Sequence, residues 1–568
     1  MLYRIVIAGG IAAALLGAAV SCRQPSGSGQ EQAEPEFVTE YLTPVRIVCS
    51  GGAVREEARL LEPFTDGQVS TRRGKHCRMG RGGWVLLDFG KELQGGIQIA
   101  RGMDADHRAA RLRVVLGESV SEALSDVNDP HTTATNDHSA RDMEMSAPWL
   151  GTVETGSSGW RFARVELLDH PADVDLIAVR VVSRLRDLPY KGSFRCSDER
   201  LNQIWQTGAY TVHLCMQDYL WDGIKRDRLV WIGDMHPEVM TVGTVFGDQA
   251  VVRRSLDFVR EQTPASEWMN GICSYSLWWL IIHHQLYRWY GDLSYLKEQQ
   301  AYIGGLLRHV LSSVDGEKEQ YTSGRFIDWP TNDRPEVIHA CLQAITVRAL
   351  EAGAYLERAL GDTPLAGECE RTAACMRSYV PPTAGNGQAA AHLSLVGMID
   401  PAEAAKTILD NGPGAFTSFM GYYMLEALAR AGKYEEAMEM IRTYWGRMLD
   451  LGATTFWEDF NYNDSLHAGR IDEVVPEGVF DIHADGGRWC YVGLRHSLCH
   501  GWASGPTAWL SRHVLGIDLV DGRVTRFDPH LGHLEWAEGT FPTPGGILWV
   551  RHEKRPDGRI KTTSKLLK

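Results

Sequence analysis

The pattern of apolar and polar positions changes twice along the chain and divides it into three regions. Between residues 37 and 194, short runs of branched and aromatic residues are separated by glycines, as is typical of antiparallel strands. The clearest runs are V-R-I-V-C, W-V-L-L-D-F-G, G-G-I-Q-I-A, R-L-R-V-V-L-G, G-W-R-F-A-R-V-E-L and D-L-I-A-V-R-V-V-S. Their spacing predicts an antiparallel β-sandwich.

From residue 195 to residue 515, apolar residues recur at helical spacing. The first helix is expected to begin near Ser197, a candidate N-cap. Further helices are predicted near 248–262, 276–290, 293–313, 336–359, 364–378, 401–410, 418–431, 434–448 and 502–514. Shorter candidates at 235–245 and 388–396 raise the total to about twelve. Short connections favour antiparallel neighbours, and about twelve helices in such pairs can close into an (α/α)6 toroid.

The third region, residues 516–568, returns to a strand-like pattern with V-D-G-R-V-T-R-F-D-P and G-G-I-L-W-V-R-H-E. A segment of roughly 50 residues is too small for a core of its own. We therefore expect a small C-terminal β region that packs against the helices.

The N-terminal residues carry a pattern typical of export. Residues 1–21 place Arg4 before an apolar run that is too short to span a bilayer comfortably. The sequence Ala19-Val20-Ser21-Cys22 resembles a lipoprotein signal, although leucine is usual at the position of Ala19. This resemblance implies a lipid on Cys22 and an exported protein, periplasmic or at the cell surface, whose membrane contact is the lipid anchor alone. An ordinary cleaved signal is the alternative, and residues 22–36 are expected to be a disordered tether.

Charge and composition narrow the range of partners. The formal net charge is -14 and the chain has no lysine- or arginine-rich run, which argues against nucleic acid and polyanionic substrates. The 18 tryptophans suit a protein that stacks against sugars. The cysteines lack the Cys-x-x-Cys spacing of a zinc site, so no metal site is predicted. Cys369 with Cys375, or Cys490 with Cys499, are possible disulfides, and buried free thiols are the alternative.

The segment Trp221–Asp234, W-D-G-I-K-R-D-R-L-V-W-I-G-D, is the strongest candidate for a functional site. Three carboxylates and three cations lie between glycines and tryptophans with no helical or strand period. Carboxylates beside arginines and indoles suit sugar chemistry, which needs a proton donor, groups that hold hydroxyls and flat apolar walls. A buried ion-pair network is the alternative interpretation.

A hydrolysing glycosidase needs a second carboxyl group on the other side of the sugar ring. Glu458, in G-A-T-T-F-W-E-D-F, is the best candidate, since the small polar residues before it are typical of a loop that enters a cleft. A surface glutamate in a turn is the alternative. The polar stretch Ser125–Asp142 is predicted to be a long loop that either covers a site or lies on the surface.

Together these segments resemble glycoside hydrolase family 78, the α-L-rhamnosidases. That family carries an R-D-E-R-x-G-W-x-G-D-type signature and a later T-T-x-W-E segment. Further matches follow in the same order: Y-S-L-W-W at 275–279, F-I-D-W at 326–329 and S-L-C-H at 497–500, followed by G-W-A-S-G-P. The segment D-F-G-K-E-L-Q-G-G resembles the β domain that precedes the barrel in these enzymes, so the resemblance covers residues 80–520 approximately.

The resemblance assigns the two catalytic carboxyl groups. Asp227 stands where the family has its general-acid glutamate, so this chain carries a side chain one methylene shorter. Glu458 matches the second catalytic glutamate and would be the general base of an inverting hydrolysis of terminal α-L-rhamnose. The two carboxyl groups are then expected roughly 6.5–9.5 Å apart. Asp227 is expected to keep a proton near neutral pH through burial or the nearby carboxylate of Asp222.

The resemblance also implies a set of sugar-binding residues. Asp222 and Asp234 are expected to hold ring hydroxyls, and His500 another hydroxyl. Because arginine charges oppose protonation of the acid, we expect at least one of Arg226 and Arg228 to engage Asp234 or a sugar hydroxyl instead. Trp279, Trp329 and Trp457 are candidates for covering the apolar side of the sugar, and a place in the core is the alternative for each. The complete predicted set is Asp222, Arg226, Trp231, Asp234, Trp279, Asp328, Trp329, Trp457 and His500.

Two alternatives stay open. One is a six-hairpin hydrolase that acts on another sugar. The other is a catalytically silent carbohydrate-binding lipoprotein, which the replacement of the family's glutamate by Asp227 keeps in consideration. The predicted partner in the main interpretation is a rhamnose-containing carbohydrate, and no cofactor is predicted.

Overall fold

The computed structural model describes residues 37–64, 76–487, 491–524 and 526–567. Residues Glu36–Lys568 form one compact unit. The predicted signal peptide, the tether and the lipidation site at Cys22 lie outside the described residues. Within the described part, none of the helices combines the length and apolar character needed to cross a membrane.

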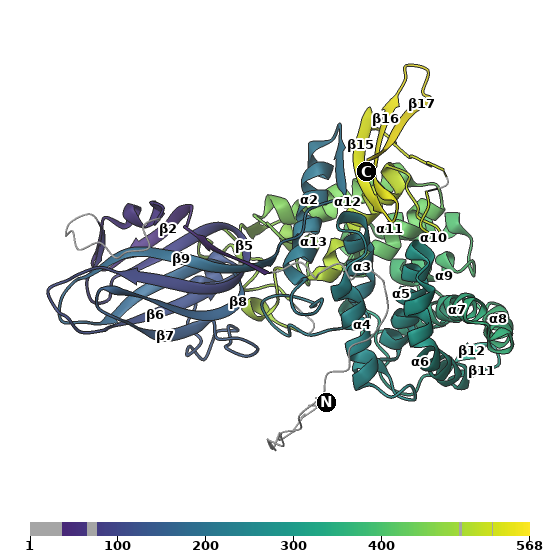
Figure 1. Ribbon diagram of the computed structural model, residues 1–568, viewed down its shortest axis with the longest axis horizontal. Coiled ribbons are helices and arrows are strands. Elements are labelled where there is room, and N and C mark those ends of the chain that lie inside the picture. Colours follow the sequence, from purple (N-terminus) through teal and green to yellow (C-terminus); the bar gives the residue numbers. More distant parts are fainter. Residues whose placement is uncertain (1–36, 65–75, 488–490, 525, 568) are drawn as a thin grey trace. The chain divides into compact units, whose positions relative to one another are not determined.

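The N-terminal region, called the sheet domain below, is an antiparallel sheet of nine strands (Figure 1). The strands are β1 (Phe37–Leu42), β2 (Arg46–Gly51), β3 (Val54–Arg55), β4 (Cys77–Met79), β5 (Trp84–Arg101), β6 (Ala110–Gly117), β7 (Asp142–Ala147), β8 (Gly151–Asp169) and β9 (Val174–Arg186). Their order is β3-β4-β9-β5-β8-β6-β7, with β1 paired to β9 and β2 paired to β5. The antiparallel β architecture predicted for this region is confirmed.

The long strand β5 explains how a single sheet encloses a core. Its first half pairs with β2 and its second half with β9, while β8 runs along it with register shifts between Asp88 and Leu93. The two runs predicted as separate strands are therefore one strand that bends at bulges. Trp160 is fully buried in the core between these strands and donates its indole N–H to the carbonyl of Gly95 at 2.9 Å.

The middle of the chain is helical, as predicted. The helices are α2 (Glu199–Cys215), α3 (Met235–Val245), α4 (Ala250–Gln262), α5 (Cys273–Tyr290), α6 (Leu293–Ser312), α7 (Pro335–Leu360), α8 (Thr363–Met376), α9 (Gly387–Leu395), α10 (Pro401–Asn411), α11 (Gly421–Arg430), α12 (Tyr434–Asp450), α13 (Tyr462–Ser465) and α14 (Gly505–Trp509), which continues as a π-helix at Leu510–Val514. The short α1 (Val120–Leu124) belongs to the sheet domain. Helix α7 packs against α5, α6, α8 and α9.

The N-cap expected at Ser197 is one residue further along. The side chain of Asp198 accepts from the backbone N–H groups of Arg200 and Leu201, whereas the hydroxyl of Ser197 accepts from Glu535. Aspartate caps a helix well because its carboxylate also interacts favourably with the helix dipole.

The C-terminal sheet has four strands, β10 (Ser193–Cys196), β15 (Trp536–Thr543), β16 (Gly546–Lys554) and β17 (Ile560–Leu567), paired in that order. It packs on the helical region, as expected, and His552 contacts the carbonyl of Leu515 at 3.0 Å. Strand β10 comes from the junction between the sheet domain and α2, which the sequence pattern did not indicate. The run V-D-G-R-V-T-R-F-D-P was wrongly predicted as a strand, since its described residues form only isolated bridges.

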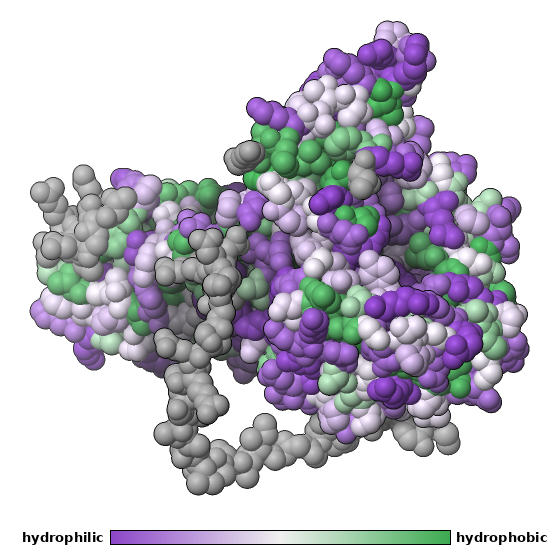
Figure 2. Space-filling view, turned by 45° about the vertical axis from the view of Figure 1, so that its right-hand side comes forward, coloured by the Kyte–Doolittle hydropathy of each residue, from purple (hydrophilic) through white to green (hydrophobic). Residues whose placement is uncertain are grey.

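Other short elements complete the description. Strands β11 (Val314–Asp315) and β12 (Lys318–Glu319) form a hairpin, and β13 (Ala468–Gly469) pairs with β14 (Phe480–Asp481). On the face shown in Figure 2, hydrophilic residues are interspersed with smaller apolar areas.

The described cysteines are free thiols. The possible disulfide between Cys369 and Cys375 is therefore not formed: Cys369 is buried and Cys375 is exposed. The other candidate pair includes Cys490, which lies outside the described residues.

Candidate active site

Both predicted catalytic carboxylates line one cavity of about 310 Å³ in the helical region. The lining residues are Asp222, Asp227, Trp231, Asp234, Ile272, Tyr275, Phe326, Trp329, Asn332, Glu458, Tyr491, His500 and Trp502. The structure thus brings together residues from segments more than 200 positions apart, as the interpretation of two distant carboxyl groups requires.

Asp227 is surrounded by hydrogen-bond donors. The indole N–H of Trp231 donates to Oδ2 at 3.2 Å, and the hydroxyl of Tyr491 donates to Oδ1 at 3.1 Å. The guanidinium of Arg226 donates to Oδ1 at 3.3 Å. On another side, Nδ1 of His138 lies 3.4 Å from Oδ1. Trp231, predicted to bind substrate, therefore also holds the predicted acid.

The backbone at Asp227 is left-handed. Asp227 has φ 50° and Arg228 has φ 52°, a conformation that costs a non-glycine residue roughly 1–2 kcal/mol. Arg228 offsets this cost by donating to the carbonyl oxygens of Ser157 at 2.9 Å and His138 at 2.7 Å. Both carbonyls belong to the sheet domain, which therefore helps to hold the loop that carries the acid.

Glu458 has the surroundings of a stable anion. Its side chain is 6% exposed and forms an ion pair with Arg226, and one carboxylate oxygen accepts from the backbone N–H of Ser497 at 3.1 Å. Burial by itself would raise the pKa of Glu458, but Arg226, His500 and the Ser497 N–H together lower it to about 2. Glu458 is therefore ionised near neutral pH, the state in which a carboxylate can accept a proton.

Asp222, Asp234 and His500 form a second polar group at the cavity wall. Nε2 of His500 lies 3.7 Å from Oδ2 of Asp222 and 3.8 Å from Oδ2 of Asp234. Burial raises the pKa of both aspartates well above the usual value, and neighbouring carboxylates, Asp227 among them, raise it further. Burial lowers the pKa of His500 to about 4. Burial thus disfavours the charged form of all three side chains, and their polar atoms are suited to bind hydroxyl groups.

The other oxygens of these two aspartates are held by the protein. Oδ1 of Asp222 accepts from the N–H of Leu229 at 3.0 Å, and Oδ1 of Asp234 accepts from the hydroxyl of Tyr275 at 2.9 Å. Each aspartate is thus fixed through one oxygen while the other faces His500.

The arginines lie differently from the prediction. Arg226 bridges Asp227 and Glu458, and Arg228 contacts the sheet domain, so neither engages Asp234. The contact with Asp234 is therefore not formed, since Arg226 pairs with Glu458 from a distant segment, whereas a contact with a sugar hydroxyl stays a prediction.

Two of the predicted tryptophans are core residues. Trp279 is fully buried, packs on His283 and donates to the carbonyl of Leu256 at 3.3 Å. Trp457 is 1% exposed and packs against Phe460. Neither lines the cavity, so their assignment to sugar stacking was wrong. Trp329 does line it, as predicted.

Asp328 lines a narrow recess beside the main cavity, together with Trp329, Glu458 and Tyr491. Its Oδ2 accepts from Thr417 at 2.7 Å and from Gln388 at 3.1 Å. Burial raises the pKa of Asp328 to about 7. The recess borders the cavity through shared walls, so Asp328 is placed near the site without lining its main chamber.

Four lining aromatics were not assigned from the sequence: Tyr275, Phe326, Tyr491 and Trp502. Tyr275, Phe326 and Trp502 stand in the matched segments Y-S-L-W-W, F-I-D-W and G-W-A-S-G-P, so the signal was present but pointed at neighbouring residues. Tyr491 had no such signal.

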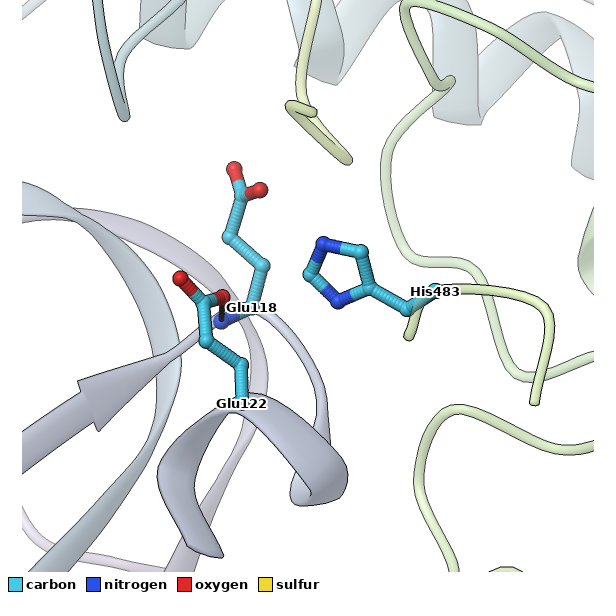
Figure 3. Close-up of side chains that lie close together, drawn as sticks. All are labelled: Glu118, Glu122 and His483. Atoms are coloured by element: carbon cyan, nitrogen blue, oxygen red, sulfur yellow. Dashed lines mark hydrogen bonds between the residues drawn. The ribbon is translucent and has the colours of Figure 1, made fainter. Parts of the chain in front are cut away.

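The loop that carries Asp227 is tied to the sheet domain by a buried charge cluster. Figure 3 shows Glu118, Glu122 and His483. One carboxylate oxygen of each glutamate and one ring nitrogen of His483 lie within 4.8 Å of one another. The ammonium of Lys225 lies 2.9 Å from Glu122, 3.5 Å from Glu118 and 3.5 Å from His483. This lysine supplies the positive charge at the centre of the group, so the arrangement is an ion-pair cluster formed around an ammonium.

Comparison with known families gave one domain match. The family model described as the bacterial α-L-rhamnosidase six-hairpin glycosidase domain matches residues 189–514. A search of curated proteins found no match.

Solved structures of rhamnosidases are similar in fold. A family GH78 rhamnosidase from Bacillus sp. GL1 superposes with a TM-score of 0.69 at 22% identity, covering 89% of this chain and 54% of that enzyme. A Klebsiella oxytoca rhamnosidase with rhamnose bound gives 0.64 at 21% identity, covering 84% of this chain and 96% of that one. A Streptomyces avermitilis α-L-rhamnosidase complexed with L-rhamnose gives 0.64 at 18%, covering 94% and 49%. The chain spans about half the length of the Bacillus and Streptomyces enzymes.

Proposed function

The chain belongs to the family of bacterial α-L-rhamnosidases with a six-hairpin glycosidase domain, and from this membership we propose that it removes terminal α-L-rhamnose from glycans or glycosides. The resemblance to glycoside hydrolase family 78 inferred from the sequence is confirmed at the level of the family.

In the proposed reaction, Asp227 gives a proton to the glycosidic oxygen as the bond from C1 to that oxygen breaks. Glu458 takes a proton from a water molecule whose oxygen forms the new bond to C1 on the opposite face. The products are free rhamnose of inverted anomeric configuration and the alcohol of the leaving group. The two protons balance, since one enters from Asp227 and one leaves to Glu458.

The observation that carries this proposal is that Asp227 and Glu458 line one cavity and contact the two terminal nitrogens of one guanidinium. Because both carboxylates reach the same side chain of Arg226, they face one site. Glu458 is paired with Arg226 and accepts from the Ser497 N–H, which keep it ionised, the state in which a carboxylate can accept a proton from water.

The cavity wall also suits a deoxy sugar. Phe326, Trp329 and Trp502 offer apolar surface for the C6 methyl group, and the side chains of Asp222, Asp234 and His500 offer partners for ring hydroxyls. Because charged residues would be expected around an acidic sugar, this wall favours a neutral one.

Two further features complete the proposal. The helices are proposed to close into the (α/α)6 toroid of six-hairpin glycosidases. Residues 1–21 are proposed to direct export, with lipid attached at Cys22, so that the enzyme acts outside the cytoplasm on carbohydrate that reaches the cell.

The direct test is release of rhamnose from an aryl α-L-rhamnoside, with the configuration of the first product followed by NMR. Asp227→Asn and Glu458→Gln should each lower turnover by about 100-fold or more while rhamnose binding persists. Asp410→Asn and Glu477→Gln, the same changes at exposed positions, serve as controls. Retained rhamnose binding without turnover by the unaltered protein would favour the silent carbohydrate-binding alternative, and retention of configuration would contradict inversion.

A further inference from the structure

The loop at residues 125–142, whose role the sequence left open, reaches the catalytic segment from the sheet domain. Ser139 donates to the carbonyl of Lys225 at 3.1 Å, and Thr133 accepts from the N–H of Leu494 at 2.8 Å. Arg495 donates to Asp137 at 2.9 Å. The loop is thus fastened both to the segment before Asp227 and to the segment that carries Tyr491.

At the end of this loop, His138 places its imidazole between two carboxylates. Nδ1 lies 3.4 Å from Oδ1 of Asp227, and Nε2 lies 3.6 Å from Oδ2 of Asp137. The His138 side chain is 28% exposed, whereas that of Asp227 is 11% exposed. The ring therefore joins the predicted acid to solvent.

The surroundings of Asp227 present a problem for a general acid. The guanidinium, indole and phenol around it all donate hydrogen bonds, and donors stabilise the ionised form of a carboxyl group. The reaction, however, needs a proton at this position. An imidazole can take up and release a proton near neutral pH, and Nδ1 of His138 faces Oδ1 of Asp227.

We propose that His138 and Asp227 hold one proton between them, and that His138 thereby stores the proton that Asp227 delivers to the leaving oxygen. This inference rests on the proposed function of Asp227. In this proposal His138 acts through Asp227 and not on the sugar directly. It is therefore a positioning residue, whose role is to place the proton on Asp227.

The proton movements balance. The N–H bond of the His138 imidazolium breaks as its proton passes to the carboxylate of Asp227, and the new O–H bond of Asp227 breaks as that same proton passes to the glycosidic oxygen. After cleavage the pair has lost one proton and Glu458 has gained one. The exposed edge of His138 takes up a proton from solvent, and Glu458 releases one to solvent.

The charges that face the pair are consistent with this role. Asp137 lies against Nε2, and although burial opposes it, hydrogen bonds from Thr135 and Arg495 hold the pKa of Asp137 below its usual value. A charged Asp137 favours the imidazolium. Arg226 and Tyr491 face Asp227 from the opposite side, and Arg228 binds the backbone carbonyl of His138.

One test follows the shared proton without using activity. In the full chain labelled with ¹³C-histidine, the titration of His138 is compared between the unaltered protein and Asp227→Asn, with the signal assigned through His138→Asn. Loss of the carboxylate should lower the His138 midpoint by about one pH unit. Asp129→Asn, in the same loop, should leave it unchanged. An unchanged midpoint in Asp227→Asn would overturn the proposal even if rhamnosidase activity is present, and the measurement stands if that activity is absent.

A second test uses pH and leaving group together. His138 has φ 66°, which asparagine tolerates, so His138→Asn removes the imidazole with little backbone strain. The alkaline limb of the kcat/KM profile should move to lower pH by about one unit. At pH 7 the loss should be about tenfold or more for an alkyl rhamnoside and small for a 4-nitrophenyl rhamnoside, whose leaving group needs little protonation.

The matched control is His131→Asn, the same change at an exposed position of the same loop. It should retain the full profile with both substrates. An equal loss for both leaving groups at every pH, or an unshifted profile in His138→Asn, would show that the residue only shapes the loop and would overturn the proposal.

Discussion

The two carboxylates of the site are held by different parts of the molecule. Glu458 receives its partners, Arg226 and the Ser497 N–H, from the helical region. Asp227 stands on a left-handed backbone that the sheet domain supports through Ser157 and His138. The comparison teaches that the direct partners of Glu458 come from the helical region, whereas those of Asp227 come from both domains.

The largest effect is expected when the loop that carries Asp227 is detached from the sheet domain. Lys225→Met removes the only ammonium found in the buried cluster with Glu118 and Glu122 among the described residues. Arg141 still pairs with Glu122 at 2.9 Å, but the loss of the charge beside both buried carboxylates should lower the free energy of unfolding by about 3 kcal/mol, measured by chemical denaturation. Lys433→Met, at a largely exposed pair with Glu436, should cost less than about 1 kcal/mol. Equal losses in the two variants would contradict the anchoring role.

The next effect tests the group that both carboxylates share. Arg226→Leu should lower kcat/KM by about 100-fold or more, since it removes the cation that organises both sides of the cavity. Burial would then raise the pKa of Glu458, and a base is lost as pH falls through its pKa. The acid limb of the pH–rate profile should therefore move to higher pH. Arg226→Lys keeps the charge but not the two-ended geometry and should fall between Leu and the unaltered protein.

A smaller effect separates the sugar-facing wall from the core. Trp329→Ala should raise KM by about tenfold with little change in kcat, because it removes apolar surface from the cavity. Trp279→Phe should leave KM unchanged and lower the free energy of unfolding by about 1–2 kcal/mol. A rise in KM for Trp279→Phe would contradict its assignment to the core.

The smallest effect sharpens the comparison at the acid itself. Asp227→Glu restores the family's residue and displaces the carboxyl group by about one methylene, so kcat/KM should change by less than about tenfold. Asp227→Asn keeps the length but loses the proton and should be far less active. If the two variants lost activity equally, moving the carboxyl group relative to His138 would cost as much activity as removing its proton, and this prediction would be contradicted.

The sequence was most informative where a single period dominates. Helices such as α5 and α7 follow from apolar residues at helical spacing, and their bounds differ from the prediction by a few residues. The strand β5 was divided in two, since its bulges interrupt the alternation. The failed strand at V-D-G-R-V-T-R-F-D-P had the right residue types but found only isolated bridges.

The sequence predicted the site residues that stand in a recognisable motif. It did not predict those whose place depends on whether the side chain is buried in the core or faces the cavity. Asp227 and Glu458 share a cavity as expected. Trp279 and Trp329 each end a matched motif, and only packing shows that Trp279 lies in the core and Trp329 faces the cavity. The contact between His138 and Asp227 joins positions 89 residues apart in different domains, and no local pattern encodes such a contact.

Strand β10 has a consequence for how the protein can be divided. It lies just before the helical region, yet it pairs along its length with β15 near the other end of the chain. A fragment cut at residues 195 and 515 would divide β10 and lose β15. The backbone N–H and C=O groups that pair these two strands would then lack partners in both fragments. The helical region is therefore tied to the C-terminal sheet through β10, and a truncated protein must keep residues 193–196 together with 536–543.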